Sequence, residues 1–225
     1  LQGMRGRYSD KRFIGKPVDT NWTQNTIGVW QLGEEEEAAK YGCVPGNFKI
    51  KDYNNDGKLT DDDYIIDGKR TPDWTGGMTN MFKIYDFDFS FRMYFRSGAT
   101  QYDRFFENFA LEWNSQNFNN LRTNYWTPEN PSNTMGRPSQ MGSRGNIAYE
   151  RTDFLKVSYI TLGYTLNKRL MSKWGLDNAR IYVTVQNPFI LTKFRGLDPE
   201  QPDLTNIGDT DGMTMNALLG VNISF

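Results

Sequence analysis

Histidine is missing from this sequence, and cysteine occurs once, at Cys43. Without histidine, the chain lacks the most frequent general base of enzymes and the most frequent protein ligand for zinc or copper. A single cysteine cannot form an internal disulfide or a cysteine-based metal site, so we interpret Cys43 as a small buried side chain. No apolar run reaches the roughly 18 residues that a transmembrane helix needs. The net charge of −1 gives no indication of nucleic-acid binding.

The sequence also has none of the parts of a secretory leader. It opens at Leu1 without an initiator methionine, a basic region or an apolar region. We therefore expect an internal-to-C-terminal piece of a longer protein, with residues 1–225 forming one portion of it.

Aromatic residues are abundant although the chain is polar: they make up 15% of a sequence that is only 37% apolar. Membrane-spanning β-strands have this kind of composition, because only alternate residues face lipid and aromatic residues gather at both interfaces. The strongest early pattern is in residues 87–96, where Phe and Met alternate with charged and polar residues. The segment 78–85 is its expected hairpin partner, through a turn at Asp86.

Three later segments also alternate like strands. The pattern in residues 154–166 changes phase after Tyr159, which indicates a β-bulge with one extra residue. Residues 180–186 alternate without interruption, and residues 213–225 form the expected closing strand, which ends on Phe225.

These patterns favour an all-β fold, a transmembrane antiparallel β-barrel, over a soluble β-sandwich. The apolar faces are uniformly apolar and the opposite faces carry Arg and Asp, as a barrel wall between lipid and a polar lumen requires. The residues expected to face lipid are Phe87, Phe89, Phe91, Phe95, Leu219, Val221 and Ile223. The residues expected to face the lumen are Arg92, Asn216 and Asn222.

Two further segments are expected at the surface. Residues 34–40 carry acidic residues in a first helical turn and predict a short solvated helix that ends near Gly42. Residues 99–150 are rich in Asn, Ser, Gly and Pro and predict one long extracellular loop, with a short helix in residues 102–111. Aromatic residues in this loop are candidates for contacts with a substrate or partner, although packing within the loop is equally compatible with the pattern. These candidates are Trp113, Tyr125 and Trp126.

Residues 52–63 match the spacing of a calcium-binding loop, with Asp in place of the usual final Glu. Calcium prefers six to eight oxygen ligands on a tight curve, and Gly57 permits the sharp turn. We predict a structural calcium ion, with an Asx-rich turn as the alternative. The expected ligands are Asp52, Asn54, Asp56, the Lys58 carbonyl, Thr60 and Asp63.

Several of these segments, in order, resemble the SusC/RagA family of TonB-dependent outer-membrane transporters from Bacteroidetes. The resemblance covers about residues 15–225. Its motifs are Pro45–Asp52 followed by Asn54–Leu59, Pro72–Gly77, Trp126–Pro131, Ile160–Tyr164, Gln186–Phe189, Gly196–Glu200 and Ile223–Phe225.

The resemblance implies a plugged barrel of about 22 strands in the outer membrane, of which this chain would hold seven to nine. It further implies TonB-energised import of oligosaccharides or peptides together with a SusD-like surface lipoprotein. The plug and the TonB-contacting segment would lie outside this chain, and Phe225 would be part of a barrel-assembly signal.

Two other classes of function would each explain only part of the sequence. A soluble calcium-binding, β-rich interaction module would explain residues 52–63 but not the alternating strands. An enzyme such as a glycosidase would need a pair of carboxylates, and no pair stands out. We therefore expect a transporter and no enzyme.

Overall fold

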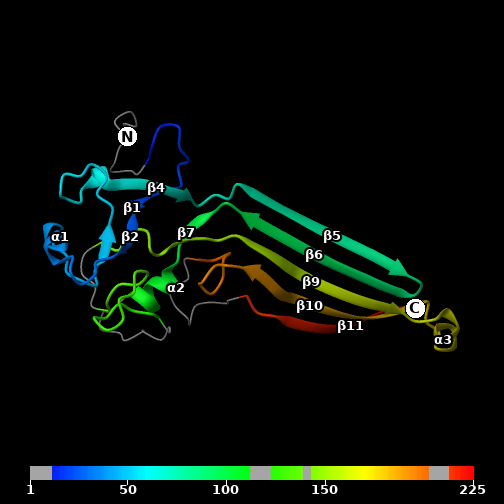
Figure 1. Cartoon of the computed structure of the whole chain (residues 1–225). Helices are drawn as coiled ribbons and strands as arrows, with labels where there is room; N and C mark the ends of the chain where they lie inside the picture. The colour runs from blue at the N-terminus through cyan, green and yellow to red at the C-terminus, as the bar shows by residue number, and fades with distance from the viewer. Residues whose placement is uncertain (1–11, 112–122, 139–142, 203–212) are drawn as a thin grey trace. The chain divides into compact units, whose positions relative to one another are not determined.

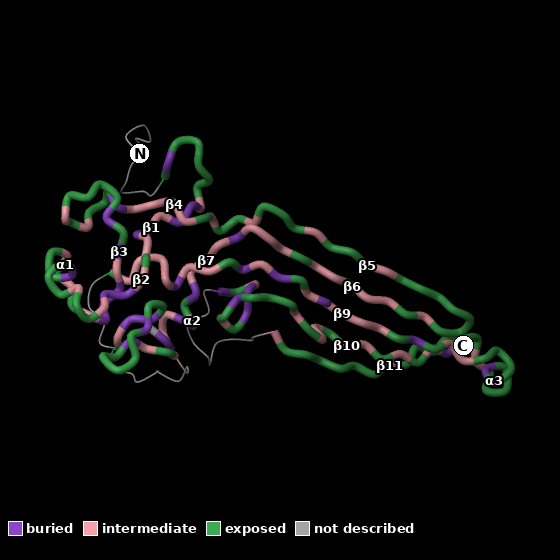
Figure 2. Tube along the Cα trace, viewed as in Figure 1, coloured by how far each residue is buried: buried purple, intermediate pink, exposed green. Residues whose placement is uncertain are grey.

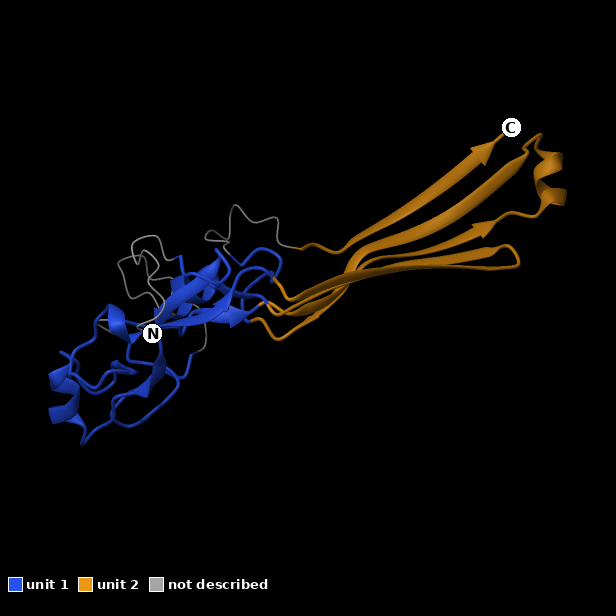
Figure 3. Cartoon of the chain, turned by 90° about the horizontal axis from the view of Figure 1, so that it is seen from above, with its two compact units in different colours: residues 1–71, 99–151, 195–209 blue, residues 72–98, 152–194, 210–225 orange. Residues whose placement is uncertain are grey.

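The computed structural model describes residues 12–111, 123–138, 143–202 and 213–225. The chain forms two compact units, shown in Figure 3. Unit 1 consists of residues 1–71, 99–151 and 195–209, and unit 2 of residues 72–98, 152–194 and 210–225.

Unit 2 is one antiparallel sheet of five strands in the order β11-β10-β9-β6-β5 (Figure 1). A short helix, α3 (Lys168–Lys173), connects β9 to β10. The strands are β5 (Trp74–Ile84), β6 (Phe87–Ser97), β9 (Phe154–Thr165), β10 (Asn178–Thr192) and β11 (Asn216–Ser224). The predicted strands are therefore confirmed, but these five long strands of the described residues are fewer than the seven to nine expected. The other described strands are short pairs in unit 1.

The register of unit 2 confirms the β-bulge and moves it by one residue. Arg92 of β6 pairs with Tyr159 of β9 and Met93 with Val157, so Ser158 is the extra residue. Tyr159 therefore lies on the same face as Arg92. The sequence pattern had instead indicated that it shares a face with Val157.

Strand β10 bends at the same level and continues past the Gln186 at which the sequence pattern ended. Gln186 pairs with Tyr159 and Phe189 with Val157, which leaves Asn187 and Pro188 outside the ladder. Proline has no N–H to donate, so a break in the ladder is the position in a strand that tolerates it. Asn187 has a positive φ of 49°, which asparagine accepts more readily than most residues.

Unit 1 is built from three two-stranded antiparallel sheets, β1 with β4, β2 with β3, and β7 with β8. The short helix expected near residues 34–40 is confirmed as α1, and Gly42 follows it with φ of 67°. The strands are β1 (Thr20–Gln24), β2 (Thr26–Val29), β3 (Phe48–Ile50), β4 (Tyr64–Lys69), β7 (Thr100–Tyr102) and β8 (Tyr149–Arg151). The helices are α1 (Glu35–Lys40), η2 (Asp61–Asp63), α2 (Arg104–Phe106) and the π-helix η3 (Glu107–Leu111).

The long segment 99–150 contains part of the core of unit 1 as well as loop. It begins with β7, α2 and η3, and β8 starts at its end. Purple, buried residues gather in this unit in Figure 2. The core cluster consists of Val29, Phe48, Ile50, Phe106, Ala110, Trp126, Met135 and Ala148. No helix in the described part of the chain is long and apolar enough to cross a membrane.

Candidate functional site

The five-stranded sheet of unit 2 has one face that is almost entirely apolar. Cross-strand partners lie on the same face of a sheet, so the register assigns every residue to a face. The apolar face carries Met78, Phe82 and Ile84 of β5, Phe87, Phe89, Phe91, Met93 and Phe95 of β6, Leu155, Val157, Ile160, Leu162 and Tyr164 of β9, Ile181, Val183, Val185, Phe189 and Leu191 of β10, and Ala217, Leu219, Val221 and Ile223 of β11. Asn80 of β5 is also on this face.

All seven residues predicted to face lipid share this face, and Arg92, Asn216 and Asn222 lie on the opposite one. Many of the apolar side chains are half exposed in this chain; Phe82 is 49% exposed and Leu219 is 75% exposed. Soluble monomers rarely expose so many apolar side chains on one face, and such a face marks contact with a membrane or another protein.

The opposite face is polar and is organised around two glycines, Gly163 and Gly220. Arg180 donates to Asp88 from Nε to Oδ1 over 2.7 Å, across the intervening strand β9. Gly163 lies beneath this ion pair, because a Cβ there would come within 2.4 Å of both side chains. Gly220 leaves the same kind of space for the Tyr182 ring, and the Arg180 guanidinium lies 4.8 Å from that ring's centroid. The sequence analysis missed this pair, because the order of the strands decides which charges meet.

The polar face also carries hydroxyl and cationic groups suited to a wet surface. Thr161 and Thr184 share a hydrogen bond of 2.8 Å between their hydroxyls. Arg96 lies 5.0 Å from the centroid of the Phe154 ring. Leu218 is the apolar exception on this face in β11, where it pairs with Thr184.

The loop at residues 52–63 is closed by carboxylates that accept hydrogen bonds from backbone N–H groups. Asp52 accepts from Asn55 at 2.6 Å and from Gly57 at 2.9 Å, and these bonds lower the pKa of its carboxyl against the opposing effect of desolvation. Gly57 has φ of 78°, the sharp turn that the motif needs.

Asp63 has a second role at the end of this loop. It is fully buried, accepts from the Tyr53 and Thr60 N–H groups at 2.8 Å each, and forms a capping box with Thr60 at η2. Asn54 and Asp56 bond each other at the exposed edge. Within the described residues, no three His, Cys, Asp or Glu side chains are grouped to hold a metal ion. The backbone turn therefore fits the motif, but its carboxylates do not converge on one point. The calcium ion stays a prediction.

Of the aromatic loop candidates, Trp126 is a core residue. It is 5% exposed, and its Nε1 donates to Gln31 Oε1 at 2.9 Å. A Cβ at Gly46 would meet its ring at 2.5 Å, so Gly46 is the residue against which it packs. Tyr125 packs against the core and donates to the Ala110 carbonyl at 2.8 Å. Tyr125 packs within the loop and Trp126 packs against residues outside it, so their role in ligand contact stays a prediction; Trp113 lies outside the described residues. Phe225 is exposed, and its role in assembly stays a prediction.

A groove of about 250 Å³ in unit 1 is a better candidate for ligand contact. Its walls carry groups that can donate to a ligand, since neither the Arg70 guanidinium nor the Tyr149 hydroxyl has a hydrogen-bond partner within the described residues. The lining residues are Val18, Asp19, Thr20, Asn21, Trp22, Arg70 and Tyr149. They come from three distant segments, which no local sequence pattern connects.

Beside the core of unit 1, an acid is buried without a full set of partners. Asp103 is fully buried; its Oδ1 accepts from Phe106 N at 2.9 Å, and its Oδ2 has no hydrogen-bond partner among the described residues. Burial raises the pKa of Asp103 and lowers the pKa of Arg195. Arg195 pairs with Glu150 and lies 3.9 Å from the Phe106 ring centroid.

Comparison with known proteins gives a consistent group of relatives. The chain is 29% identical over 238 residues to TonB-dependent receptor P26 of Formosa agariphila, which covers 98% of this chain and 24% of that protein. It is 30% identical over 212 residues to TonB-dependent receptor SusC of Bacteroides thetaiotaomicron, covering 91% of this chain and 20% of that protein. No family model matches the chain.

The solved structures agree on the fold. The structure of the RagAB peptide importer in the open-open state superposes with a TM-score of 0.69 and 19% identity, over 95% of this chain and 23% of that one. The structure of the RagAB peptide transporter gives a TM-score of 0.66. The chain thus spans between a fifth and a quarter of the length of the proteins it matches.

Proposed function

The chain belongs to the TonB-dependent receptors of the SusC and RagA type, β-barrel proteins of the outer membrane, and we propose that its parent protein imports oligosaccharides or peptides with energy supplied through TonB. The chain is part of the barrel. Transport is a proposal for the parent protein, because this chain spans at most a quarter of its relatives.

The observation that carries this proposal is the separation of apolar and polar residues onto the two faces of the sheet. The apolar face would contact lipid, and the face with Asp88, Arg180 and Arg92 would face the interior of the barrel. A large polar interior suits the passage of hydrophilic nutrients past a plug. The proposal assigns no catalytic step to the chain, in keeping with the receptor names of its relatives.

The proposed partner is a SusD-like surface lipoprotein, which the family resemblance implies as a lid over the extracellular opening. The segments of unit 1 leave the sheet at the end of β6 and β10, opposite the short turn between β5 and β6. Outer-membrane barrels have short periplasmic turns and long extracellular loops, so we propose that the long connection between β6 and β9 and the segment after β10 are extracellular. The groove with Arg70 and Tyr149 would then be accessible to a nutrient or to the lid.

Deletion of the parent gene tests the transport proposal. The deletion strain should fail to accumulate at least one class among labelled peptides and labelled oligosaccharides, and the wild-type gene should restore uptake. Mild extraction of the parent protein should recover a lipid-anchored protein with it. Unchanged uptake of both classes, with the parent protein isolated alone, would refute the proposal.

For the parent protein we also propose a structural calcium ion at residues 52–63. Asp52, Asn54, Asp56 and the Lys58 carbonyl supply its oxygens, and Thr60 and Asp63 complete the set if the loop tightens. Asp56→Ala should abolish protection of this loop by calcium in hydrogen exchange. Asp61→Ala, which changes an acid at a position of the motif that is expected to supply no ligand, should not. If calcium leaves the exchange of residues 52–63 unchanged in the wild-type protein, the loop is only a turn.

A further inference from the structure

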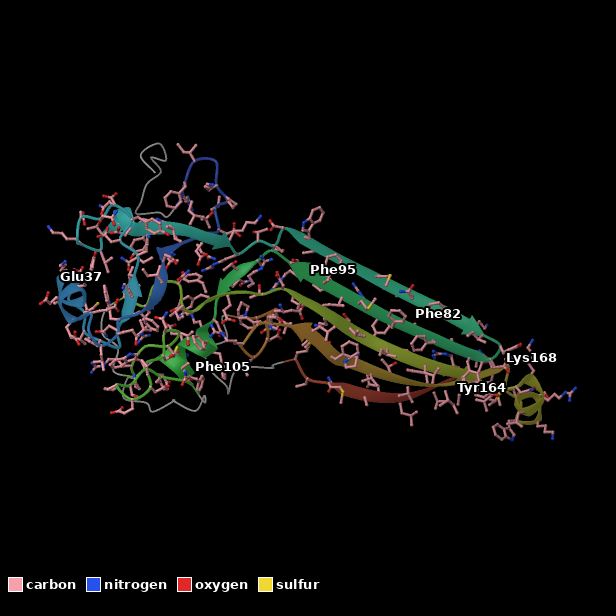
Figure 4. All side chains as sticks on the ribbon, in the orientation of Figure 1. Glu37, Phe82, Phe95, Phe105, Tyr164 and Lys168 are labelled. Carbon is pink, nitrogen blue, oxygen red and sulfur yellow. The ribbon has the colours of Figure 1, made fainter. Side chains whose placement is uncertain are left out.

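Helix α3 connects β9 to β10 at the end of the sheet that also holds the β5–β6 turn. Phe87, at the start of β6, pairs with Tyr164 near the end of β9, so this turn and α3 lie at the same end. The connection between β5 and β6 is two residues long, Tyr85 and Asp86. The connection between β9 and β10, which contains α3, is twelve residues long. Short connections place this end on the periplasmic side of an outer-membrane barrel. Figure 4 shows Tyr164 and Lys168 together there.

Aromatic residues are concentrated at this end of the sheet. Tyr85 is 92% exposed at the tip of the turn, and Trp174, directly after α3, is 65% exposed. The rings of Phe87 and Tyr164 lie 4.7 Å apart on the apolar face. Such residues mark the level of the lipid headgroups, where an apolar ring with a polar edge is most stable.

The surface of α3 combines cations with exposed apolar side chains. Lys168, Arg169 and Lys173 are exposed and take part in none of the ion pairs among the described residues. Leu170 is exposed as well, whereas Met171 is buried and attaches the helix to the protein. The helix is only six residues long, so its side chains and not its N-terminus form the surface.

The spacing sorts these side chains into two adjacent stripes. Residues four apart are neighbours on a helix, which places Arg169 beside Lys173; Leu170 lies next to this pair, and Trp174 is the C-cap residue that follows the last turn. A cationic stripe next to an apolar one is the arrangement of a helix that lies in a membrane interface. Long cationic side chains reach the phosphates while their stems cover apolar surface.

We propose that α3 and the adjoining turn anchor the barrel to phospholipids of the periplasmic leaflet. Lys168, Arg169 and Lys173 bind headgroup phosphates, and Leu170 and Trp174 insert at the boundary with the acyl chains. The occupant is a lipid because α3 lies at the end of a sheet that has an exposed apolar face, and the charge of α3 complements phosphate. This inference depends on the outer-membrane location and is independent of what the parent protein transports.

Lipid retention provides the first test, with the full-length parent protein in micelles that contain phosphatidylcholine with or without phosphatidylglycerol. Native mass spectrometry should show phosphatidylglycerol bound to the wild-type protein. The variant Lys168→Gln/Arg169→Gln/Lys173→Gln should bind it more weakly, by about fivefold per cation removed. The control Lys16→Gln/Lys51→Gln/Lys193→Gln changes the net charge equally, in exposed residues outside α3, and should retain the lipid. Equal losses in the two variants would overturn the proposal.

Depth measurement provides the second test and leaves the three cations in place. A fluorophore on Leu170→Cys, in a parent protein with Cys43→Ser and no other reactive thiol, is reconstituted in phosphatidylcholine vesicles. Brominated lipid should quench it and aqueous iodide should not. Quenching by iodide alone would place α3 in water, and protection from both quenchers would show a protein partner or the plug over it; either result overturns the proposal.

Discussion

Phe48 of unit 1 and Phe82 of unit 2 are the same amino acid on β-strands of one chain, yet Phe48 is 2% exposed and Phe82 is 49% exposed. Phe48 lies among Val29, Ile50 and Trp126 in a core that the protein encloses by itself. Phe82 lies on the apolar face of the sheet, where its ring stacks near those of Phe89 and Phe91. The comparison shows two ways of removing apolar surface from water, since unit 1 uses its own side chains and unit 2 requires the hydrocarbon of a membrane.

Truncation of the two phenylalanines should separate these two environments most strongly. Phe48→Ala leaves a cavity in a closed core and should cost about 3–5 kcal/mol of local stability in unit 1. Phe82→Ala should cost much less, because lipid chains can fill the space. Hydrogen exchange of the β2 and β3 amides in the parent protein measures the first effect and should not change in Phe82→Ala. Equal effects on these amides would show that the two units do not differ in this way.

Two adjacent leucines test the assignment of faces within unit 2. Leu219→Arg places a cation on the apolar face and should cost about 2–4 kcal/mol, enough to reduce the folded protein in the outer membrane. Leu218→Arg makes the same change one residue away, on the face with Thr184, and should be tolerated. The heat-modifiable mobility of each variant on a gel reports the folded fraction. A greater loss for Leu218→Arg would reverse the two faces.

The Asp88–Arg180 pair should have a smaller effect, because both side chains keep some contact with solvent. Asp88→Ala or Arg180→Ala alone should cost about 1 kcal/mol of unfolding free energy in urea. The exchange Asp88→Arg/Arg180→Asp should recover part of this loss. Additive losses in the exchanged protein would show that the two charges do not interact.

The smallest effect is expected at Asp103 in unit 1. Burial raises its pKa, so the folded state binds the proton more tightly than the unfolded state does. This contribution to stability is complete below the unfolded pKa and is lost as pH rises through the folded pKa. Asp103→Asn should therefore stabilise unit 1 at neutral pH by about 1 kcal/mol or less and flatten the pH dependence. Asp61→Asn, at an exposed acid, is the control, and destabilisation by Asp103→Asn at neutral pH would contradict the prediction.

The strands of unit 2 could be predicted from the sequence because lipid imposes the same requirement on every second residue. Alternation identified β5, β6, β9, β10 and β11 and the faces of all seven residues predicted to meet lipid. It did not extend through Asn187 and Pro188, where the ladder is interrupted, and it placed the bulge one residue too late. Leu218 also shows that alternation need not be strict on the polar face, which tolerates an apolar residue.

The candidate sites were harder to predict, because they join residues that are distant in sequence. Trp22, Arg70 and Tyr149 meet in one groove only after unit 1 has folded. Trp126 was a candidate for ligand contact because it is an aromatic residue in a polar loop. Its ring packs in the core, in space that is open because Gly46 has no side chain. The sequence contains one local sign of the Asp88–Arg180 pair. It is Gly163, at a position of β9 where the alternation would otherwise place a polar side chain.

The extra residue Ser158 has a consequence for parity, the odd or even count that decides where each side chain points. Even positions of β9 face the apolar side after Ser158 and odd positions face it before, so Leu155 and Ile160 share a face although they are five residues apart. Removing Ser158 would bring Leu155 and Ile160 to four residues apart, so a regular strand without a bulge would keep both toward lipid and Lys156 on the polar face. Removing a regularly paired residue such as Thr161 would instead turn one part of β9 over, because a shift by one residue moves every following side chain to the opposite face.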